Sequence, residues 1–153
     1  LKVNGLSIIS HVFKKAEKAN IGEVIVATED QEIIDDVKKN GGRAILTKKQ
    51  HQTGTDRIYE VLQRFNTSNI DLVMNLQGDE PLINVDDIRN LNNLMTKNNS
   101  KLGTLASKIL DEEIYGDQNV VKVITKENLN NSNFPEATNF IRKNIIPIRQ
   151  IIL

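Results

Sequence analysis

Two acids follow a short apolar run in the middle of the chain. The run extends from Leu72 to Leu76, and the segment from Gln77 to Pro81 comes directly after it. The run predicts a strand that is covered on both faces, and Gly78 allows a sharp turn at its end. Ligands of open α/β sheets bind at the carboxyl ends of strands, where an Asp79 oxygen would suit a Mg²⁺ ion that carries phosphates. A solvated acidic turn remains the alternative.

A second polar cluster precedes this run and ends at Arg57. Its seven residues are His51, Gln52, Thr53, Gly54, Thr55, Asp56 and Arg57. Gly54 permits close approach of a ligand, and a helix beginning here would present free N–H groups to an anion. Arg57 could bind a phosphate, a carboxylate or a base edge. Simple N-capping by Thr53 or Thr55, with Asp56 in the first turn, remains open.

Two further polar side chains are candidates for ligand binding. Gln77 could contact a base edge or a ribose through its amide. Lys122 is the only charged residue in the apolar run from Val120 to Ile124, and it could face an anionic substrate. It could equally lie on the solvent side of an edge strand, where a lysine discourages aggregation.

No sequence pattern in the chain indicates a nucleophile for covalent catalysis. The chain has no cysteine, which excludes thiol catalysis, disulfides and Cys-ligated zinc. His11 and His51 are far apart in sequence, and no nucleophile-elbow pattern is present. Positioning and metal electrostatics remain, and these are the usual means of phosphoryl and nucleotidyl transfer.

The elements that must hold these residues alternate along the chain. Apolar spacing predicts helices over 6–19, 31–40, 54–65 and 84–95, and strands over 23–28, 43–47, 72–76, 102–109 and 120–125. Asn4-Gly5 predicts a turn. Loops are expected at 66–69 and 128–133, and a short helix at 137–142. This order is typical of βαβ crossovers, so we expect an α/β fold with a mainly parallel sheet and helices on both faces.

Length and charge set further bounds. The 153 residues predict a single domain over 1–153. Twenty basic and twenty acidic residues balance, which argues against a broad nucleic-acid surface. No apolar run could span a bilayer and no signal peptide is visible, so we expect no membrane insertion and a cytoplasmic location.

Taken together, these motifs resemble the 3-deoxy-D-manno-octulosonate (Kdo) cytidylyltransferases, also called CMP-Kdo synthetases. The most specific segments are His51 to Arg57 and Gln77 to Pro81, with Val121-Lys122-Val123 downstream. The resemblance implies a Rossmann-like nucleotidyltransferase fold that converts CTP and Kdo into CMP-Kdo and pyrophosphate for lipopolysaccharide synthesis. It also implies that the intact family forms homodimers.

The resemblance also assigns roles to individual residues. Asp79 would be a Mg²⁺ ligand and, with Lys122, a catalytic residue. The nucleotide-binding residues would be His51, Thr53, Gly54, Thr55, Asp56, Arg57, Gln77 and Gly78.

The family's sequence also contains an N-terminal phosphate loop and a later aspartate that this chain lacks. We therefore expect a central fragment, truncated at both ends, with little activity alone. Two alternatives stay open. One is another sugar nucleotidyltransferase, such as a CMP-sialic acid synthetase, and the other is a non-catalytic interaction module.

Overall fold

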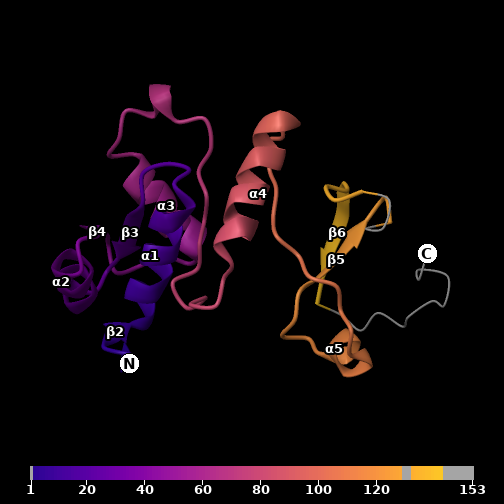
Figure 1. Cartoon of the computed structure of the whole chain (residues 1–153), viewed down its shortest axis with the longest axis horizontal. Helices are drawn as coiled ribbons and strands as arrows, with labels where there is room; N and C mark the ends of the chain where they lie inside the picture. Colours follow the sequence, from indigo (N-terminus) through magenta and orange to yellow (C-terminus); the bar gives the residue numbers. More distant parts are fainter. Residues whose placement is uncertain (1, 129–131, 143–153) are drawn as a thin grey trace. The chain divides into compact units, whose positions relative to one another are not determined.

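Helices and strands alternate along the chain, as predicted for the α/β class. A computed structural model describes residues 2–128 and 132–142, without the side chain of Glu112. The chain forms two compact units, Leu1–Asn93 and Leu94–Leu153, and the division falls within helix α4 (Val85–Lys97) (Figure 1). No helix in the described ranges is long and apolar enough to cross a membrane. The single domain over 1–153 stays a prediction.

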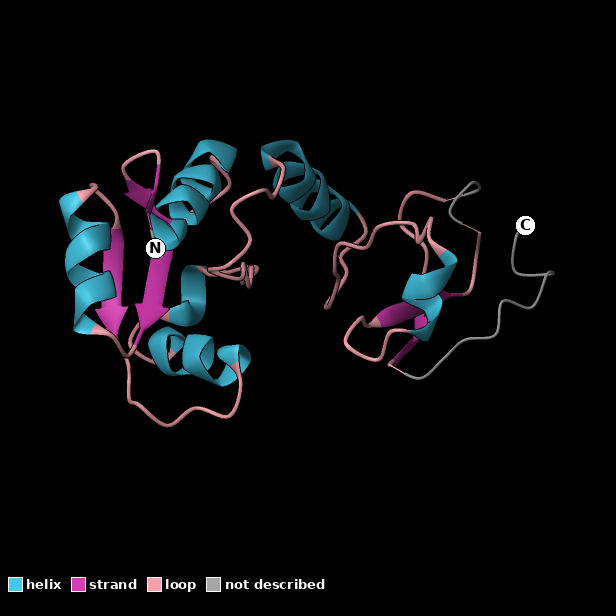
Figure 2. Cartoon of the chain, turned by 90° about the horizontal axis from the view of Figure 1, so that it is seen from below, coloured by secondary structure: helices cyan, strands magenta, loops and turns pink. Residues whose placement is uncertain are grey.

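A strand–helix–strand unit forms the centre of the first unit. Strands β3 (Ile25–Thr28) and β4 (Arg43–Leu46) pair in parallel, and helix α2 (Gln31–Lys39) connects them. Figure 2 shows the two arrows side by side and pointing the same way. These elements confirm the predicted crossover. Parallel pairing is less extensive than expected, because the other two strand pairs within the described residues are antiparallel.

The core of this unit lies between the strand pair and two helices. Phe13 on helix α1 (Ile8–Ala19), Val26 on β3 and Val37 on α2 are almost fully buried together. Gly42 packs against this cluster, since a Cβ there would lie 2.8 Å from Val37 Cγ1 and 2.9 Å from Phe13 Cε2. The sequence between α2 and β4 therefore requires glycine at this position.

A tight hairpin precedes α1. Strands β1 (Lys2–Val3) and β2 (Leu6–Ser7) are antiparallel, and Asn4 and Gly5 both have positive φ angles, of 49° and 81°. Two such residues are typical of a type I′ turn, as the Asn-Gly pair predicts. Ser7 then caps α1 by accepting a hydrogen bond from the Ser10 N–H at 3.1 Å.

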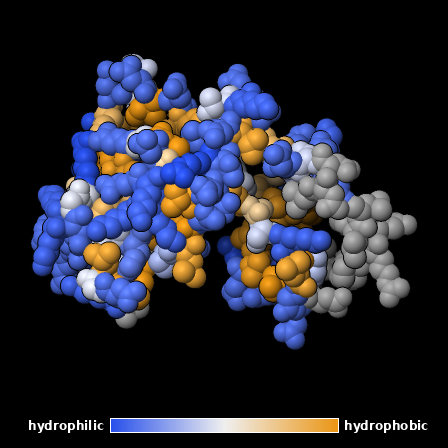
Figure 3. Space-filling view, in the orientation of Figure 1, coloured by the Kyte–Doolittle hydropathy of each residue, from blue (hydrophilic) through white to orange (hydrophobic). Residues whose placement is uncertain are grey.

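The predicted strand over Leu72–Leu76 is wrong for this chain. No backbone group of residues 71–76 is hydrogen-bonded to the backbone of another described residue. Leu72 and Val73 are 38% and 49% exposed. Apolar surface interrupts the polar surface in several places in Figure 3. An apolar run becomes a strand only where neighbours pair with it and cover it, and local sequence does not reveal those neighbours.

Two helices flank this extended stretch along the chain. Helix α3 (Gly54–Leu62) precedes it and is followed by a single 3₁₀ turn, η1 (Thr67–Asn69), where a loop was predicted. Helix α4 follows it, where a helix over 84–95 was predicted, and Asn84 accepts the Asp86 N–H at 2.8 Å at its start.

Helix α4 is fixed to the end of α1 by a side chain. Arg89 donates to the carbonyl oxygens of Ala19, at 3.1 Å, and Lys18, at 2.6 Å. An arginine satisfies the last carbonyls of a helix well, since these lack intrahelical partners. Ile88, one residue earlier, is 1% exposed and forms the buried side of α4 as predicted.

The second unit contains an antiparallel pair and a short helix. Strand β5 (Lys122–Thr125) confirms the predicted strand, and it pairs with β6 (Ala137–Ile141). The predicted short helix at 137–142 is therefore wrong, because pairing with β5 outweighs the weak helical preference of so short a segment. The predicted strand at 102–109 is also wrong, since that stretch pairs with no strand among the described residues and is mostly exposed. Helix α5 (Glu112–Gly116) was not predicted.

Candidate functional site

The carboxyl ends of β3 and β4 lie together and carry polar residues. The Thr47 N–H extends the ladder by donating to the Thr28 carbonyl at 2.8 Å. Glu29 follows β3, and the β4–α3 loop, defined as residues 47–53, follows β4. This edge of a parallel pair is where α/β folds bind ligands.

Arg57 connects this edge to the first turn of α3. Its guanidinium donates to Glu29 Oε2 at 2.6 Å, to Thr47 Oγ1 at 2.6 Å and to the Lys48 carbonyl at 3.4 Å. The side chain of Arg57 is 21% exposed. Of the partners foreseen for Arg57, the structure shows a carboxylate of the same chain, and contact with a ligand's phosphate or base remains untested.

The N-terminus of α3 is closed by a capping box. Thr53 Oγ1 accepts the Asp56 N–H at 3.1 Å, while Asp56 Oδ2 accepts the Thr53 N–H at 3.1 Å and the Thr53 hydroxyl at 2.7 Å. The capping interpretation is therefore confirmed, with Thr53 rather than Thr55 as the N-cap. Asp56 is turned back to the helix end, and Thr55 is exposed.

His51 is turned toward the body of α3. Its Nε2 lies 2.6 Å from Glu60 Oε2, and the two side chains are 12% and 13% exposed. Burial raises the pKa of Glu60, but hydrogen bonds from the Lys48 N–H, His51 and Arg64 outweigh burial and hold that pKa below its usual range. His51 thus contacts a carboxylate of its own chain.

The two sequence clusters meet at the start of α3. A Cβ built on Gly54 would lie 3.8 Å from both the Nε2 and Oε1 atoms of Gln77. Asn75 Nδ2 lies 3.5 Å from Thr55 Oγ1, and Gln77 Nε2 donates to Asn75 Oδ1 at 3.2 Å. The extended stretch therefore runs along the helix N-terminus and places the Gln77 amide beside Gly54.

The turn after Gln77 leaves Asp79 exposed. Gly78 packs tightly on α1, since a Cβ there would lie 2.8 Å from Ile9 Cδ1. Asp79 makes no hydrogen bond or ion pair with another described residue, and the described part of the chain has no group of three His, Asp or Glu side chains able to hold a metal. Mg²⁺ in nucleotide sites uses one or two carboxylates with phosphates and water, so a single free carboxylate fits it.

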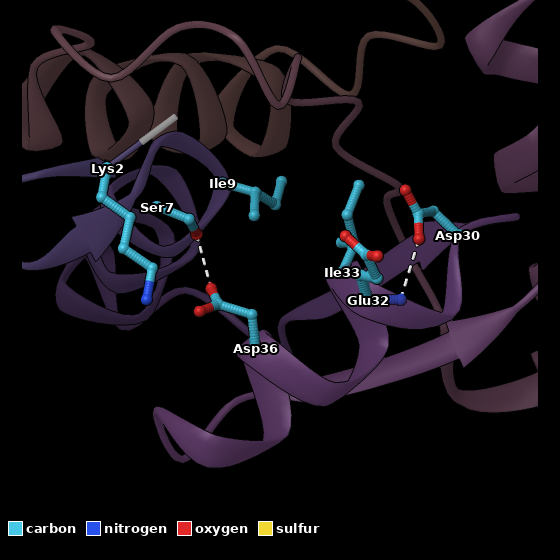
Figure 4. Close-up of a pocket in the computed structure, with 7 residues that line it drawn as sticks. All are labelled: Lys2, Ser7, Ile9, Asp30, Glu32, Ile33 and Asp36. Atoms are coloured by element: carbon cyan, nitrogen blue, oxygen red, sulfur yellow. Dashed lines mark hydrogen bonds between the residues drawn. The ribbon is translucent and has the colours of Figure 1, made fainter.

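A cavity of about 430 Å³ opens beside α1 and α2 and contains none of the predicted site residues. Its lining consists of Lys2, Ser7, Ile9, Asp30, Glu32, Ile33 and Asp36 (Figure 4). Asp36 Oδ2 accepts hydrogen bonds from the hydroxyls of Ser7 and Ser10 at 2.5 and 2.7 Å. These bonds lower the pKa of Asp36. Three carboxylates against one ammonium make this cavity unfavourable for a triphosphate.

Lys122 lies in the second unit and is 1% exposed, so the solvent-facing interpretation is wrong. Its ammonium donates to the carbonyls of Asp117 and Arg142, which joins the turn before β5 to the residue after β6. A catalytic role for Lys122 stays a prediction.

Sequence reasoning missed two acidic residues of the site. Glu29 was not predicted as a site residue, but in the structure it pairs with Arg57, while the next residue, Asp30, is the N-cap of α2. Glu60 was not singled out, although it contacts three residues. The position of Glu29 directly after a strand was the one available signal.

Known proteins match nearly the whole chain. Residues 1–152 match the sequence profile of the family described as Cytidylyltransferase. The 3-deoxy-manno-octulosonate cytidylyltransferase of Thermodesulfovibrio yellowstonii is 42% identical over 127 residues, covering 79% of this chain and 50% of the relative. The protein of that name from Rhodopseudomonas palustris is 42% identical over 125 residues, covering 81% and 51%. The chain therefore spans about half the length of these curated relatives.

The fold also matches a solved structure. A CMP:2-keto-3-deoxy-manno-octonic acid synthetase complexed with CTP superposes with a TM-score of 0.78 at 29% identity. The match covers 97% of this chain and 58% of that one. The predicted nucleotidyltransferase fold is thereby confirmed.

Proposed function

The chain belongs to the cytidylyltransferase family, and from that premise we propose that it takes part in cytidylyl transfer from CTP to Kdo. The products would be CMP-Kdo and pyrophosphate. The curated relatives carry the name of this activity, and the similar solved structure is described as holding CTP. Because the chain spans about half of those relatives, their activity is a proposal for this chain.

The observation that carries the proposal is the approach of Gln77 to Gly54. It brings the amide of one motif to the helix start of the other, at 3.8 Å from the position of a Cβ. The N–H groups at the start of α3 are suited to a phosphate, and the Gln77 amide is suited to the base or ribose. Both kinds of contact are needed to hold one nucleotide.

In the proposed reaction, the anomeric hydroxyl of Kdo attacks the α-phosphate of CTP and loses its proton. The bond from the α-phosphorus to the bridging oxygen breaks, and pyrophosphate leaves with that oxygen. Asp79 would hold Mg²⁺, which neutralises phosphate charge when bound. Such a displacement needs positioned groups rather than a protein nucleophile, in agreement with the lack of cysteine.

Nucleotide binding tests the proposal directly. Isothermal titration in Mg²⁺ should show that CTP binds more tightly than UTP or ATP, and any pyrophosphate release should require Kdo. Equal binding of all three nucleotides would contradict cytidylyl specificity. Binding of none would favour the interaction module, and release with sialic acid instead of Kdo would favour the sialic acid enzymes.

Three further roles remain proposals. Lys122 would act on the anionic substrates, the intact protein would be a homodimer, and it would work in the cytoplasm.

A further inference from the structure

The β4–α3 loop has no helix or strand of its own, yet it is held along one side of α3. Arg57, Glu60 and Arg64 lie three and four residues apart, so they share a helix face. Arg57 contacts Thr47 and the Lys48 carbonyl, and Arg64 donates to the Leu46 carbonyl at 2.9 Å. Together with Glu60, these side chains contact residues 46, 47, 48 and 51 on the path from the end of β4 to the helix start.

Glu60 is the acceptor at the centre of this face. Its Oε2 accepts the Lys48 N–H at 3.1 Å and contacts His51 Nε2 at 2.6 Å, while its Oε1 accepts a hydrogen bond from Arg64. The first two contacts are near opposite ends of the loop. With its side chain 13% exposed, the carboxylate is partly shielded, which strengthens such charged hydrogen bonds.

The loop leads directly into the nucleotide candidates. Thr53 is both the last residue of the loop and the N-cap of α3, and Gly54 follows under Gln77. Lys48 is fixed through both its N–H and its carbonyl. A change in the loop would therefore move the helix start relative to Gln77.

We propose that Glu60 is a positioning residue that holds the β4–α3 loop in the shape required for nucleotide binding, and that His51 acts through Glu60 rather than on the nucleotide itself. This inference rests on the proposed function and deepens it. Glu60 touches no substrate in this account, and its effect passes through Lys48 and His51.

Amide hydrogen exchange tests the holding of the loop without any nucleotide. In Glu60→Ala, the Lys48 N–H should exchange roughly tenfold faster, since it loses a charged acceptor. The neighbouring Thr47 N–H donates to Thr28 and is the internal control, which should not change. Unchanged exchange at Lys48 would overturn the proposal.

CTP affinity tests the consequence for binding. Glu60→Ala should weaken CTP binding by roughly tenfold, and Glu60→Gln, which keeps an acceptor and nearly the same shape, should recover part of the loss. Glu17→Ala, at an exposed position on α1, is the matched control and should bind as the wild type does. Melting temperatures identify any variant that is merely unfolded, and Glu60→Gln then carries the test.

A double-mutant cycle decides the role of His51. If His51 acts through Glu60, then His51→Gln and Glu60→Gln together should weaken CTP binding no more than the stronger single change. Fully additive losses would mean that His51 acts independently, and would overturn that part. A wild-type chain that binds no CTP refutes the proposed function and the binding role of Glu60, whereas loss in the Glu60 variants but not in Glu17→Ala supports both.

Discussion

Arg57, in the first turn of α3, donates a hydrogen bond at 2.6 Å to Glu29, the residue that follows β3. The same guanidinium donates to Thr47 at the end of β4. One side chain therefore joins three elements at the edge where the ligand is expected. Its planar fork suits this geometry better than a lysine ammonium does.

Removing the negative charge of this pair should reduce stability modestly. Glu29→Gln should lower the free energy of unfolding by about 0.5–1 kcal/mol, because the two side chains are only partly shielded, at 21% and 41% exposure. Glu23→Gln is the matched control, since its pair with Arg43 is 54% exposed on both sides and should contribute close to nothing. Urea denaturation measures both, and equal losses would contradict the difference in environment.

Asp79→Asn should remove the dependence of CTP binding on magnesium. The wild type is expected to bind CTP at least about tenfold more tightly with Mg²⁺ than without it, a difference of ~1.4 kcal/mol. The variant should bind equally in both conditions, because an amide is a poor ligand for this ion. Glu80→Gln, the adjacent exposed acid, is the control. A full magnesium effect in Asp79→Asn would refute the assignment.

Alanine substitutions of Thr53 and Thr55 should differ in their effect on stability, because only Thr53 caps α3. Thr53→Ala removes the hydroxyl that accepts the Asp56 N–H, leaves only the bond from the residue-53 backbone N–H to Asp56, and should cost about 1 kcal/mol of stability. Thr55→Ala removes only a contact of 3.5 Å with Asn75, so its stability should stay within about 0.5 kcal/mol of the wild type. Thermal unfolding without nucleotide checks both variants, and equal destabilisation would argue against Thr53 as the cap.

Gly42→Ala should destabilise the first unit. The new methyl group would overlap Val37 and Phe13, which are 0% and 2% exposed and cannot turn away, so a loss of about 1–3 kcal/mol is expected. Gly22→Ala is the control, because nothing lies within 4 Å of a Cβ there. A stable Gly42→Ala protein would show that α1 and α2 pack less tightly than described.

Acid stability should depend on Asp36. Hydrogen bonds from Ser7 and Ser10 lower the folded pKa of Asp36 below its ordinary value of 3.8. The stabilisation is therefore fully present above that pH and is lost as pH falls through the folded pKa. In Asp36→Asn or Ser10→Ala, the free energy of unfolding should fall less steeply in this range. Denaturant titrations at several acidic pH values test this, and a wild-type slope in Asp36→Asn would contradict it.

Elements with strong local signals could be predicted from sequence. The apolar spacing of α1 and α2, the Asn-Gly turn and the cap of α4 all depend on residues close together in the chain. The stretch from Leu72 to Leu76 and strand β6 were predicted wrongly, because their local sequence does not decide their structure. Strand formation there depends on partners distant in sequence, and hydrophobic pattern alone does not identify them.

The candidate site was predicted in part for a similar reason. Thr53 and Gly54 at the start of α3 indicate a helix cap, and Gly78 with Asp79 and Glu80 indicates an acidic turn. The partners of Arg57 and His51 could not be foreseen, because Glu29 and Glu60 look like ordinary surface acids until the fold brings them within 2.6 Å. The burial of Lys122 could not be predicted either, because its ammonium donates to main-chain carbonyls, which side-chain types in the sequence do not indicate.

The extended stretch beside α3 has a consequence for handling the protein. Its row of free amides and carbonyls, next to exposed Leu72 and Val73, can pair with any extended chain that approaches. A formal charge of zero provides little long-range repulsion to keep two molecules apart. This stretch is therefore one place where two molecules can associate at high concentration, and Val73→Lys is a simple way to oppose that association.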